Sequence, residues 1–275
     1  MPEYKEHYVA FLDILGFKEL LSSASCDEIH SIFDVLHEKS HGTYNLNDVE
    51  IKAFEHIHHM ILSDSVIVYI ESDVEDAFAS LILICKKLQF ALANREKPIL
   101  LRGGIAVGGL FYENDIIFGE GLTKAYLLEN NLAKYPRIVF TGDTLSIGFK
   151  NTKYMLARME GSVTPYNQDD DALYYINYLQ PSGLILNEIV QYFDRLKEKC
   201  RYQLNQGIES GLREKYLWLY RKIDNEIKTI INVESFYLRR EKEEEEKREE
   251  DYKKRFSSVY LNSDELEVET EESEK

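Results

Sequence analysis

The sequence predicts an α+β fold, in which a sheet with antiparallel strands and helices precedes a helical C-terminal extension. Strand-like and helix-like segments alternate over about the first 180 residues. Two consecutive strand-like segments, 56–62 and 66–70, are joined by Ser63-Asp64-Ser65, whose residue types favour a tight turn. Because such a hairpin pairs its strands antiparallel, the pattern favours a mixed sheet with helices to one side over a doubly wound parallel sheet.

The individual elements follow from residue type and periodicity. β-branched and aromatic residues predict a strand over Tyr8–Ile14, which runs into Gly16. Apolar residues on one face predict a helix over Asp27–His37, and Ser72 is a suitable N-cap for a helix that runs to about Ala93. Four more elements are expected before residue 180: a strand over Leu100–Val107 ended by Gly108-Gly109, a helix over Leu122–Leu132, and strands over Arg137–Phe140 and Ala172–Tyr178.

The C-terminal third contains helical patterns alone. Residues 183–233 hold two segments with apolar side chains at spacings of three and four, and for Trp218 in the second segment packing is a better interpretation than ligand binding. Residues 234–256 form a charged arm with many i,i+4 opposite-charge pairs, and residues 257–275 form an acidic tail expected to be disordered. The predicted division is therefore a domain over 1–182, a helical extension, a helical arm and a tail.

Composition limits the classes of function. The chain has 275 residues with 49 acidic and 33 basic side chains, a formal charge of −16, and its hydrophobic fraction of 44% excludes a wholly disordered chain. The acidity argues against binding to a nucleic-acid polymer, which requires clustered Lys and Arg. It allows a small anionic substrate, provided that a metal ion intervenes.

Cysteine usage and hydropathy predict a soluble cytoplasmic protein. Cys26, Cys85 and Cys200 form no CxxC pair, which is typical of a reduced compartment. The N-terminus lacks the cationic and apolar pattern of a signal peptide, and no apolar run approaches the roughly 20 residues of a membrane span. We therefore expect no membrane association.

Two aspartates stand out as candidate metal ligands. Asp13 lies near the end of the first strand, and Asp64 lies at the tip of the hairpin. Taken separately, a strand-end residue and a turn residue are the simpler interpretation. Brought together, the two carboxylates would repel each other unless a cation lay between them, and Mg²⁺ takes carboxylate and carbonyl oxygens while leaving positions for substrate phosphates. The carbonyl group of Ile14 could supply a further ligand.

Four motifs in order resemble the class III nucleotidyl cyclase domain, over residues 7 to about 145. Residues 11–17 (FLDILGF) match the family's first metal-binding strand, F-x-D-I-x-G-F, and Ser63-Asp64 match its second metal-binding aspartate on a hairpin. Residues 102–108 (RGGIAVG) match its R-x-G-I-x-x-G strand, and Gly119 precedes a helix as the family's pattern requires. The resemblance implies a ferredoxin-like cyclase domain.

Within this family, the segment after Gly119 is most similar to the pyrimidine cyclases of bacterial Pycsar antiphage systems. The common purine cyclases have Asn and Arg in this helix, where the present chain has Thr123 and Leu127, and their purine-selecting Lys and Asp fall near Met60 and Ile116. The resemblance implies conversion of UTP to 3′,5′-cyclic UMP and pyrophosphate, in a defence system where a separate effector protein reads the product.

The resemblance also implies roles for individual residues. Asp13 and Asp64 would be catalytic and, with Ile14, would hold two Mn²⁺ or Mg²⁺ ions. The substrate-binding residues implied are Phe11, Arg102 and Thr123, with Lys124 and Arg137 as weaker candidates for phosphate or base contacts. The family forms its site at a homodimer interface, so the helix over 122–129 of one protomer would face the aspartates of the other.

Alternatives stay open on the residues alone. The chain could be a cytidylate cyclase or a purine (adenylate or guanylate) cyclase, or a catalytically silent cyclase-like domain that binds a ligand or partner.

His56, His58 and His59 could suggest zinc, but on a strand they point to both faces, so a half-exposed strand is the better interpretation. Asp169-Asp170-Asp171 predict a solvated turn.

Overall fold

The computed structural model describes residues 3–40, 45–46, 49–50, 52–150, 152, 165–180, 183–206, 209–232, 244–248 and 250. The chain divides into two compact units, residues 1–223 and 224–275. In the second unit residues 224–232, 244–248 and 250 are helical, whereas the predicted acidic tail and most of the charged arm lie outside the described residues. Within the described ranges, no helix combines the length and apolar character of a membrane span.

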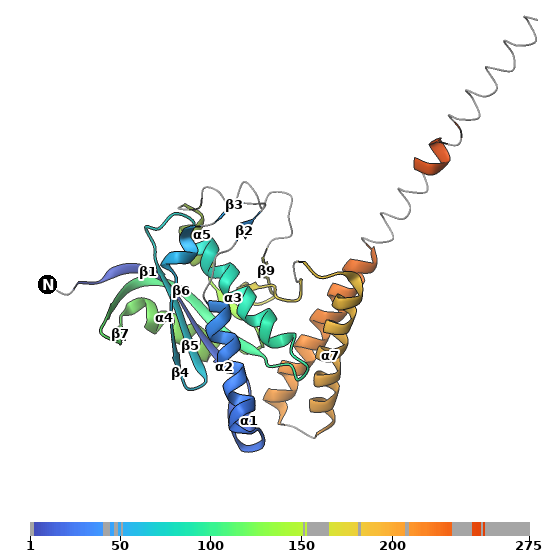
Figure 1. Ribbon diagram of the computed structural model, residues 1–275, viewed down its shortest axis with the longest axis horizontal. Coiled ribbons are helices and arrows are strands. Elements are labelled where there is room, and N and C mark those ends of the chain that lie inside the picture. Colours follow the sequence, from blue (N-terminus) through green and yellow to red (C-terminus); the bar gives the residue numbers. More distant parts are fainter. Residues whose placement is uncertain are drawn as a thin grey trace, which may run out of the picture. The chain divides into compact units, whose positions relative to one another are not determined.

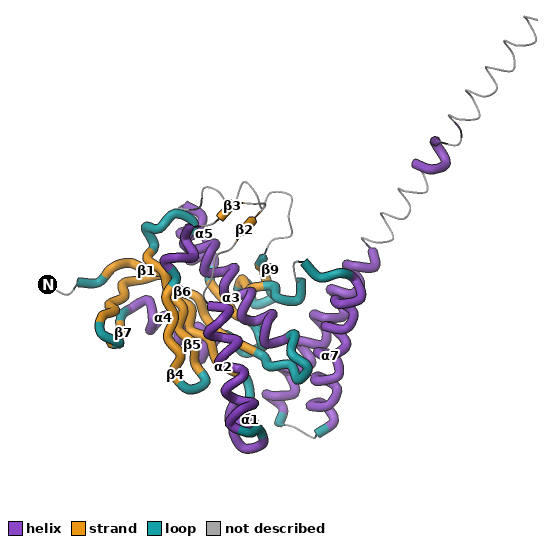
Figure 2. The backbone as a smooth tube through the Cα atoms, in the orientation of Figure 1, coloured by secondary structure: helices purple, strands orange, loops and turns teal. Residues whose placement is uncertain are grey.

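The predicted α+β fold is confirmed. The main sheet has eight strands in the order β4-β5-β1-β6-β8-β10-β9, with β7 beside β6, and in the described part of the chain β6 and β8 form its one parallel pair. Figure 2 shows these strands in orange. Their bounds are β1 (Lys5–Ile14), β4 (His58–Leu62), β5 (Ser65–Glu71), β6 (Leu101–Glu113), β7 (Ile116–Phe118), β8 (Ile138–Phe140), β9 (Tyr166–Gln168) and β10 (Tyr174–Ile176). A separate ribbon pairs β2 (Asn45–Leu46) with β3 (Val49–Glu50).

Helices cover both faces of the sheet, and the prediction that they lie to one side is therefore wrong. Alternate residues of β1 point to opposite faces. Tyr8, Ala10 and Leu12 join the core formed with α2 (Cys26–Ser40) and α3 (Ala77–Ala93), which Figure 1 shows in front of the sheet. Val9 packs on the other face in a smaller core that includes Ala125 of α4 (Glu120–Leu132). Two shorter helices are α1 (Phe17–Ser23) and α5 (Gly142–Lys150).

Two predicted boundaries near the hairpin need correction. The strand expected from His56 begins at His58, because His56 ends a 3₁₀ helix over Lys52–His56. The helix α3 begins at Ala77 rather than after Ser72. The Ser72 hydroxyl instead donates to the Glu6 carboxylate at 3.1 Å, which fastens the loop to β1.

Strand β6 continues through Gly108-Gly109, where the sequence predicted its end. The glycines of this strand allow α4 to lie directly against the backbone. A Cβ atom at Gly108 would lie 2.9 Å from the Gly121 nitrogen, and one at Gly104 would lie 2.4 Å from the Ala125 carbonyl oxygen. Glycine in this strand therefore marks a close backbone approach rather than a turn.

Replacing Gly104 with alanine should lower the free energy of unfolding by roughly 3 kcal/mol, because the new methyl group meets the backbone of α4 and one element must move. Denaturant titration followed by circular dichroism measures this loss. The matched control is Gly211→Ala, at a helical position with open space around it. That variant should be neutral or slightly more stable, since alanine favours helix. Equal stability of the two variants would contradict the close packing.

The two helices predicted beyond residue 182 are present as α7 (Leu186–Asn205) and residues 210–223, which continue the first compact unit. The buried stripe of α7 consists of Tyr192, Phe193, Leu196 and Cys200. Lys197 and Arg201 of α7 lie over the Tyr220 ring, so the helices pack side by side, as Figure 1 shows in yellow and orange.

The turn between β9 and β10 is solvated at Asp170 and Asp171, as predicted, but the prediction is wrong for Asp169, whose side chain is buried in an ion-pair cluster. Its side chain is 7% exposed and lies 2.5 Å from Arg137 Nη1 and 2.9 Å from Lys222 Nζ, and the Trp218 indole also donates to it. Burial raises the pKa of Asp169, but the hydrogen bonds from Lys222 and Trp218, together with the charges of Arg137 and Lys222, outweigh it, and the pKa falls below its usual value. The cluster fastens the helix over 210–223 to the sheet.

Candidate functional site

A cleft of about 510 Å³ lies where β1 ends, and both predicted metal-binding aspartates line it. Its walls come from the loop after β1, from α1, from the tip of the β4–β5 hairpin, and from the two C-terminal helices. The polar and charged side chains along it are Asp13, Lys18, Glu19, Ser23, Asp64, Arg102, Lys199, Gln203, Lys215 and Tyr216.

Strand pairing brings the two aspartates together. Asp13 pairs in register with Ser65 of β5 on one side and with Arg102 of β6 on the other. The Ile14 amide donates to the Asp64 carbonyl oxygen at 3.0 Å, which closes the ladder at the hairpin tip. Gly16 then adopts a left-handed conformation with φ of 79°, so that the chain turns into α1 directly after the aspartate strand.

Arg102 holds the Asp13 side chain through an ion pair. Its Nε donates to Asp13 Oδ2 at 3.0 Å, and its Nη2 lies 2.8 Å from Glu129 Oε1. Burial nevertheless raises the pKa of Asp13, with a further contribution from the negative charge of Asp64, while Arg102 opposes both. The Asp13 carboxylate therefore lies in a partly buried site beside a second acidic side chain.

Glu129 supports the site from outside the cleft through its contact with Arg102, and the sequence did not predict it. It lies on α4, its side chain is 4% exposed, and burial raises its pKa although Arg102 opposes the shift. A signal was present in the sequence, because Glu129 continues the buried i,i+4 series of Gly121 and Ala125 on α4. An acid on the buried face of a helix needs a partner, and Arg102 is that partner.

The donor set at the cleft fits hard divalent cations that also bind a substrate. Asp13 and Asp64 supply carboxylate oxygens, and Ile14 lines the same cleft. In the part of the chain that the structure describes, no group of three or more His, Cys, Asp or Glu side chains converges as a complete metal site. Mg²⁺ and Mn²⁺ suit such a partial set, because water and substrate phosphates complete their coordination.

The other substrate-binding candidates lie outside this cleft of the single chain. Phe11 faces α4 and packs edge-on against Tyr126, with ring centroids 5.4 Å apart. Thr123 is exposed on α4 and donates its hydroxyl to the Gly119 carbonyl oxygen. Lys124 pairs with Glu120 at 2.9 Å, and Arg137 belongs to the Asp169 cluster. Of the predicted binding residues, Arg102 alone joins the two aspartates in this cleft.

Lys199 and Lys215 line the cleft and were not among the predicted site residues. Lys199 comes from α7, and Lys215 comes from the helix over 210–223. Burial lowers the pKa of Lys215, and so does the charge of Arg102, whereas the charges of Asp13 and Glu129 raise it. No local pattern points to these lysines, because their place in the cleft depends on how the C-terminal helices fold back onto the sheet.

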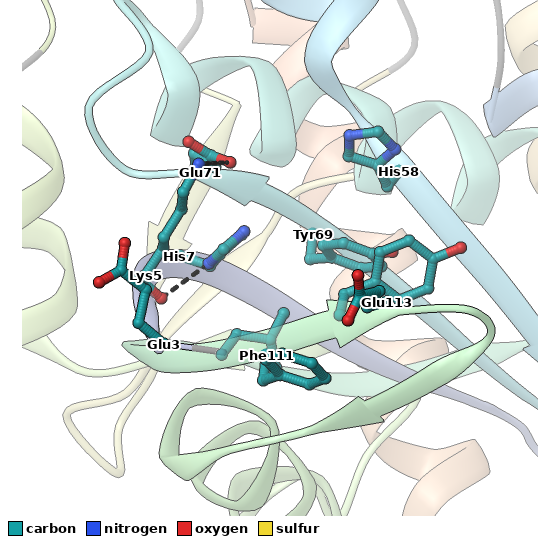
Figure 3. Close-up of a pocket in the computed structure, with 10 residues that line it drawn as sticks. Glu3, Lys5, His7, His58, Tyr69, Glu71, Phe111 and Glu113 are labelled. Carbon is teal, nitrogen blue, oxygen red and sulfur yellow. Dashed lines mark hydrogen bonds and ion pairs between the residues drawn. The ribbon is translucent and has the colours of Figure 1, made fainter. Parts of the chain in front are cut away.

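A second cavity, of about 510 Å³, contains His58 (Figure 3). His58 stacks on Tyr69 with ring centroids 5.4 Å apart, and Lys5 and Glu71 form an ion pair at 2.8 Å beside them. Burial lowers the pKa of His58, and the nearby His7 lowers it further. His58 pairs in register with Tyr69, whereas Asp64 lies beyond the other end of β4, so His58 belongs to a different region from the aspartates.

Comparison with known proteins gives a structural likeness of low identity. No protein-family model and no curated protein matches the chain. The guanylyl cyclase domain of the RhoGC fusion protein from the aquatic fungus Blastocladiella emersonii is similar at 14% identity and a TM-score of 0.44, covering 64% of this chain and 96% of that one. The adenylate/guanylate cyclase/hydrolase from Silicibacter pomeroyi is similar at 13% identity and a TM-score of 0.42, covering 66% and 99%. Because the identities and TM-scores are low, the function has to be inferred from the residues of the cleft.

Proposed function

We propose that this protein is a metal-dependent nucleotidyl cyclase. The observation that carries the proposal is the convergence of Asp13, Asp64 and Arg102 at the end of β1, in a cleft large enough for a nucleotide's phosphates. These are the residues of three of the four motifs that resemble class III cyclases. The reaction joins the ribose 3′-oxygen to the α-phosphorus and releases pyrophosphate, so the site must bind a triphosphate in a protein of charge −16.

The chain's own groups have distinct tasks in this reaction. Asp13 and Asp64 would hold two Mg²⁺ or Mn²⁺ ions, with the carbonyl group of Ile14 as a further ligand. When bound, such ions lower the pKa of the ribose hydroxyl and offset the charge of the phosphates. Arg102 would exchange its contact with Asp13 for a phosphate oxygen while Glu129 keeps its guanidinium in place.

For the base, we propose a pyrimidine, with UTP as the preferred substrate and cyclic UMP as a messenger for a separate effector in antiphage defence. The similarity of residues 121–140 to Pycsar cyclases supports this proposal. The positions of the selecting Lys and Asp of purine cyclases fall near Met60 and Ile116, neither of which has the charged group of those residues. Thr123 and Leu127 likewise differ from the usual Asn and Arg.

A homodimer is part of the proposal. Large apolar side chains are exposed on the β6–β7 ribbon and along α4, which are neighbouring elements. They are Tyr112, Ile116, Phe118, Tyr126, Leu127 and Leu132. An apolar surface of this kind is typical of a protein–protein interface. In the dimer, α4 of the partner subunit would reach the nucleotide held by the aspartates.

The test is to incubate the purified protein with each of ATP, GTP, CTP and UTP, with Mn²⁺ and with EDTA, and to identify products by mass spectrometry. We expect equal amounts of cyclic UMP and pyrophosphate from UTP, and none with EDTA. Turnover of ATP or GTP alone would contradict the pyrimidine assignment. Absence of product from all four nucleotides, at a molar mass that light scattering shows to be dimeric, would favour a catalytically silent domain.

A further inference from the structure

The C-terminal helices form one wall of the aspartate cleft. Lys199 and Gln203 reach it from the last turns of α7, and Lys215 and Tyr216 reach it from the first turns of the helix over 210–223. These residues are close to the connection between the two helices, so the tip of the helical pair is the part that meets the cleft. The extension therefore contributes directly to the surface that contains Asp13.

The cleft is lined by more cationic than acidic side chains, whereas the chain as a whole has more acidic ones. Four cationic side chains line the cleft against three acidic ones, although the protein carries a net charge of −16. The guanidinium of Arg102 already contacts both Asp13 and Glu129. The other cations of the cleft are Lys18, Lys199 and Lys215, and among the described residues none of the three makes an ion pair. Lys199 and Lys215 are the two that the helical extension supplies, and their ammonium groups are available to an anion.

Side-chain contacts hold the helix that carries Lys215 in one orientation about its own axis. Lys215, Trp218 and Lys222 are spaced by three and four residues, which places them along one face of the helix. Trp218 and Lys222 both donate to Asp169 at 2.9 Å. An anchored helix can hold a lysine toward the cleft more firmly than a mobile tail could, which favours a role in binding.

We infer that Lys199 and Lys215 bind the terminal phosphates of the nucleoside triphosphate, so that the helical extension is part of the substrate site of its own protomer. This inference rests on the proposed function and extends it to residues beyond the cyclase motifs. Two ammonium groups opposite two carboxylate-bound ions would surround a polyphosphate with positive charge. Pyrophosphate, which carries the same terminal phosphates, would bind the same lysines as the leaving product.

Inorganic tripolyphosphate tests the inference without a base or a reaction. Calorimetric titration of the full chain in the presence of Mn²⁺ should show binding, and Lys215→Gln should weaken it about ten- to hundredfold, as expected for a lost charge-assisted contact. Lys199→Gln should act in the same direction. The matched control is Arg213→Gln, which removes an exposed cation from the same helix outside the cleft and should leave binding unchanged. Lys215→Arg should restore most of the affinity.

Different results would contradict the polyphosphate site and the cyclase activity. Unchanged tripolyphosphate affinity in both glutamine variants would overturn the inference, as would a wild-type protein that binds no tripolyphosphate. Increased turnover in Lys215→Gln would also overturn it, because the lysine would then block the cleft rather than serve it. If the variants weaken binding but the wild type cyclises no nucleotide, the polyphosphate site stands and the cyclase proposal fails.

Discussion

Replacing Asp64 with asparagine should reduce nucleotide cyclisation by roughly a thousandfold or more, which corresponds to about 4 kcal/mol of transition-state stabilisation. The amide keeps the shape of the turn but removes one of the two carboxylates at the end of β1. Asp13→Asn should have an effect of similar size, and it also removes one of the two acidic partners of Arg102. Initial rates of pyrophosphate release at saturating Mn²⁺ measure both losses.

The control for these variants is another aspartate at a hairpin tip. Asp115 lies in the turn between β6 and β7, where its φ is positive and asparagine is equally suitable, and it does not line the cleft. Asp115→Asn should therefore bind Mn²⁺ as the wild type does. Electron paramagnetic resonance of Mn²⁺ provides a direct readout of metal binding. If Asp64→Asn bound Mn²⁺ as the wild type does and kept its activity, the two-carboxylate site would be wrong.

Replacing Arg137 with methionine should lower the free energy of unfolding by about 3 kcal/mol, the lower end of the cost of breaking a buried ion pair, because Lys222 still pairs with Asp169. Arg137 is fully buried, and its loss leaves Asp169 with Lys222 as its remaining cation. It also removes the guanidinium from the faces of three aromatic rings. The midpoint of thermal unfolding should fall by roughly 10 °C, as calorimetry would show.

A surface variant provides the control for Arg137→Met, and the dependence of stability on acid pH provides a second measurement. Lys134→Ala removes an exposed cation three residues away and should change stability by about 0.5 kcal/mol at most. Because the pKa of Asp169 lies below its usual value of 3.8, its contribution is complete above that pH and is lost as the pH falls through the lowered pKa. In Arg137→Met, the free energy of unfolding should fall less steeply at acid pH than it does in the wild type. The same acid dependence in both proteins would mean that the Asp169 cluster contributes little to stability.

Local patterns in the sequence predicted the strand that carries Asp13, the hairpin that carries Asp64, and most helices. A hairpin is a short-range structure, and its turn residues determine where Asp64 lies. Arg102 was also predicted, because its motif lies within a single strand. In each of these cases the information about the local element is contained in a few adjacent residues, so the sequence could predict the element, whereas the roles of the three side chains stay predictions.

The errors arose where distant segments determine the environment. Asp169 follows turn-forming residues, but Arg137 and the helix over 210–223 bury it, and neither contact has a local signal. The continuation of β6 through Gly108 depends on the close approach of α4, which is a tertiary property. The same reason explains why Lys199 and Lys215 were missed, since ordinary amphipathic helices contain many lysines at such positions.

The Asp169 anchor has a consequence for how this protein can change over evolution. A helix turns by about 100° per residue. The contacts of Trp218 and Lys222 therefore determine the direction, around the helix axis, in which each preceding side chain of the helix points. Lengthening the connection between the C-terminal helices leaves that direction unchanged, whereas inserting one residue between positions 215 and 218 rotates Lys215 out of register with the cleft. The three-residue spacing between Lys215 and Trp218 is therefore constrained by the Asp169 anchor.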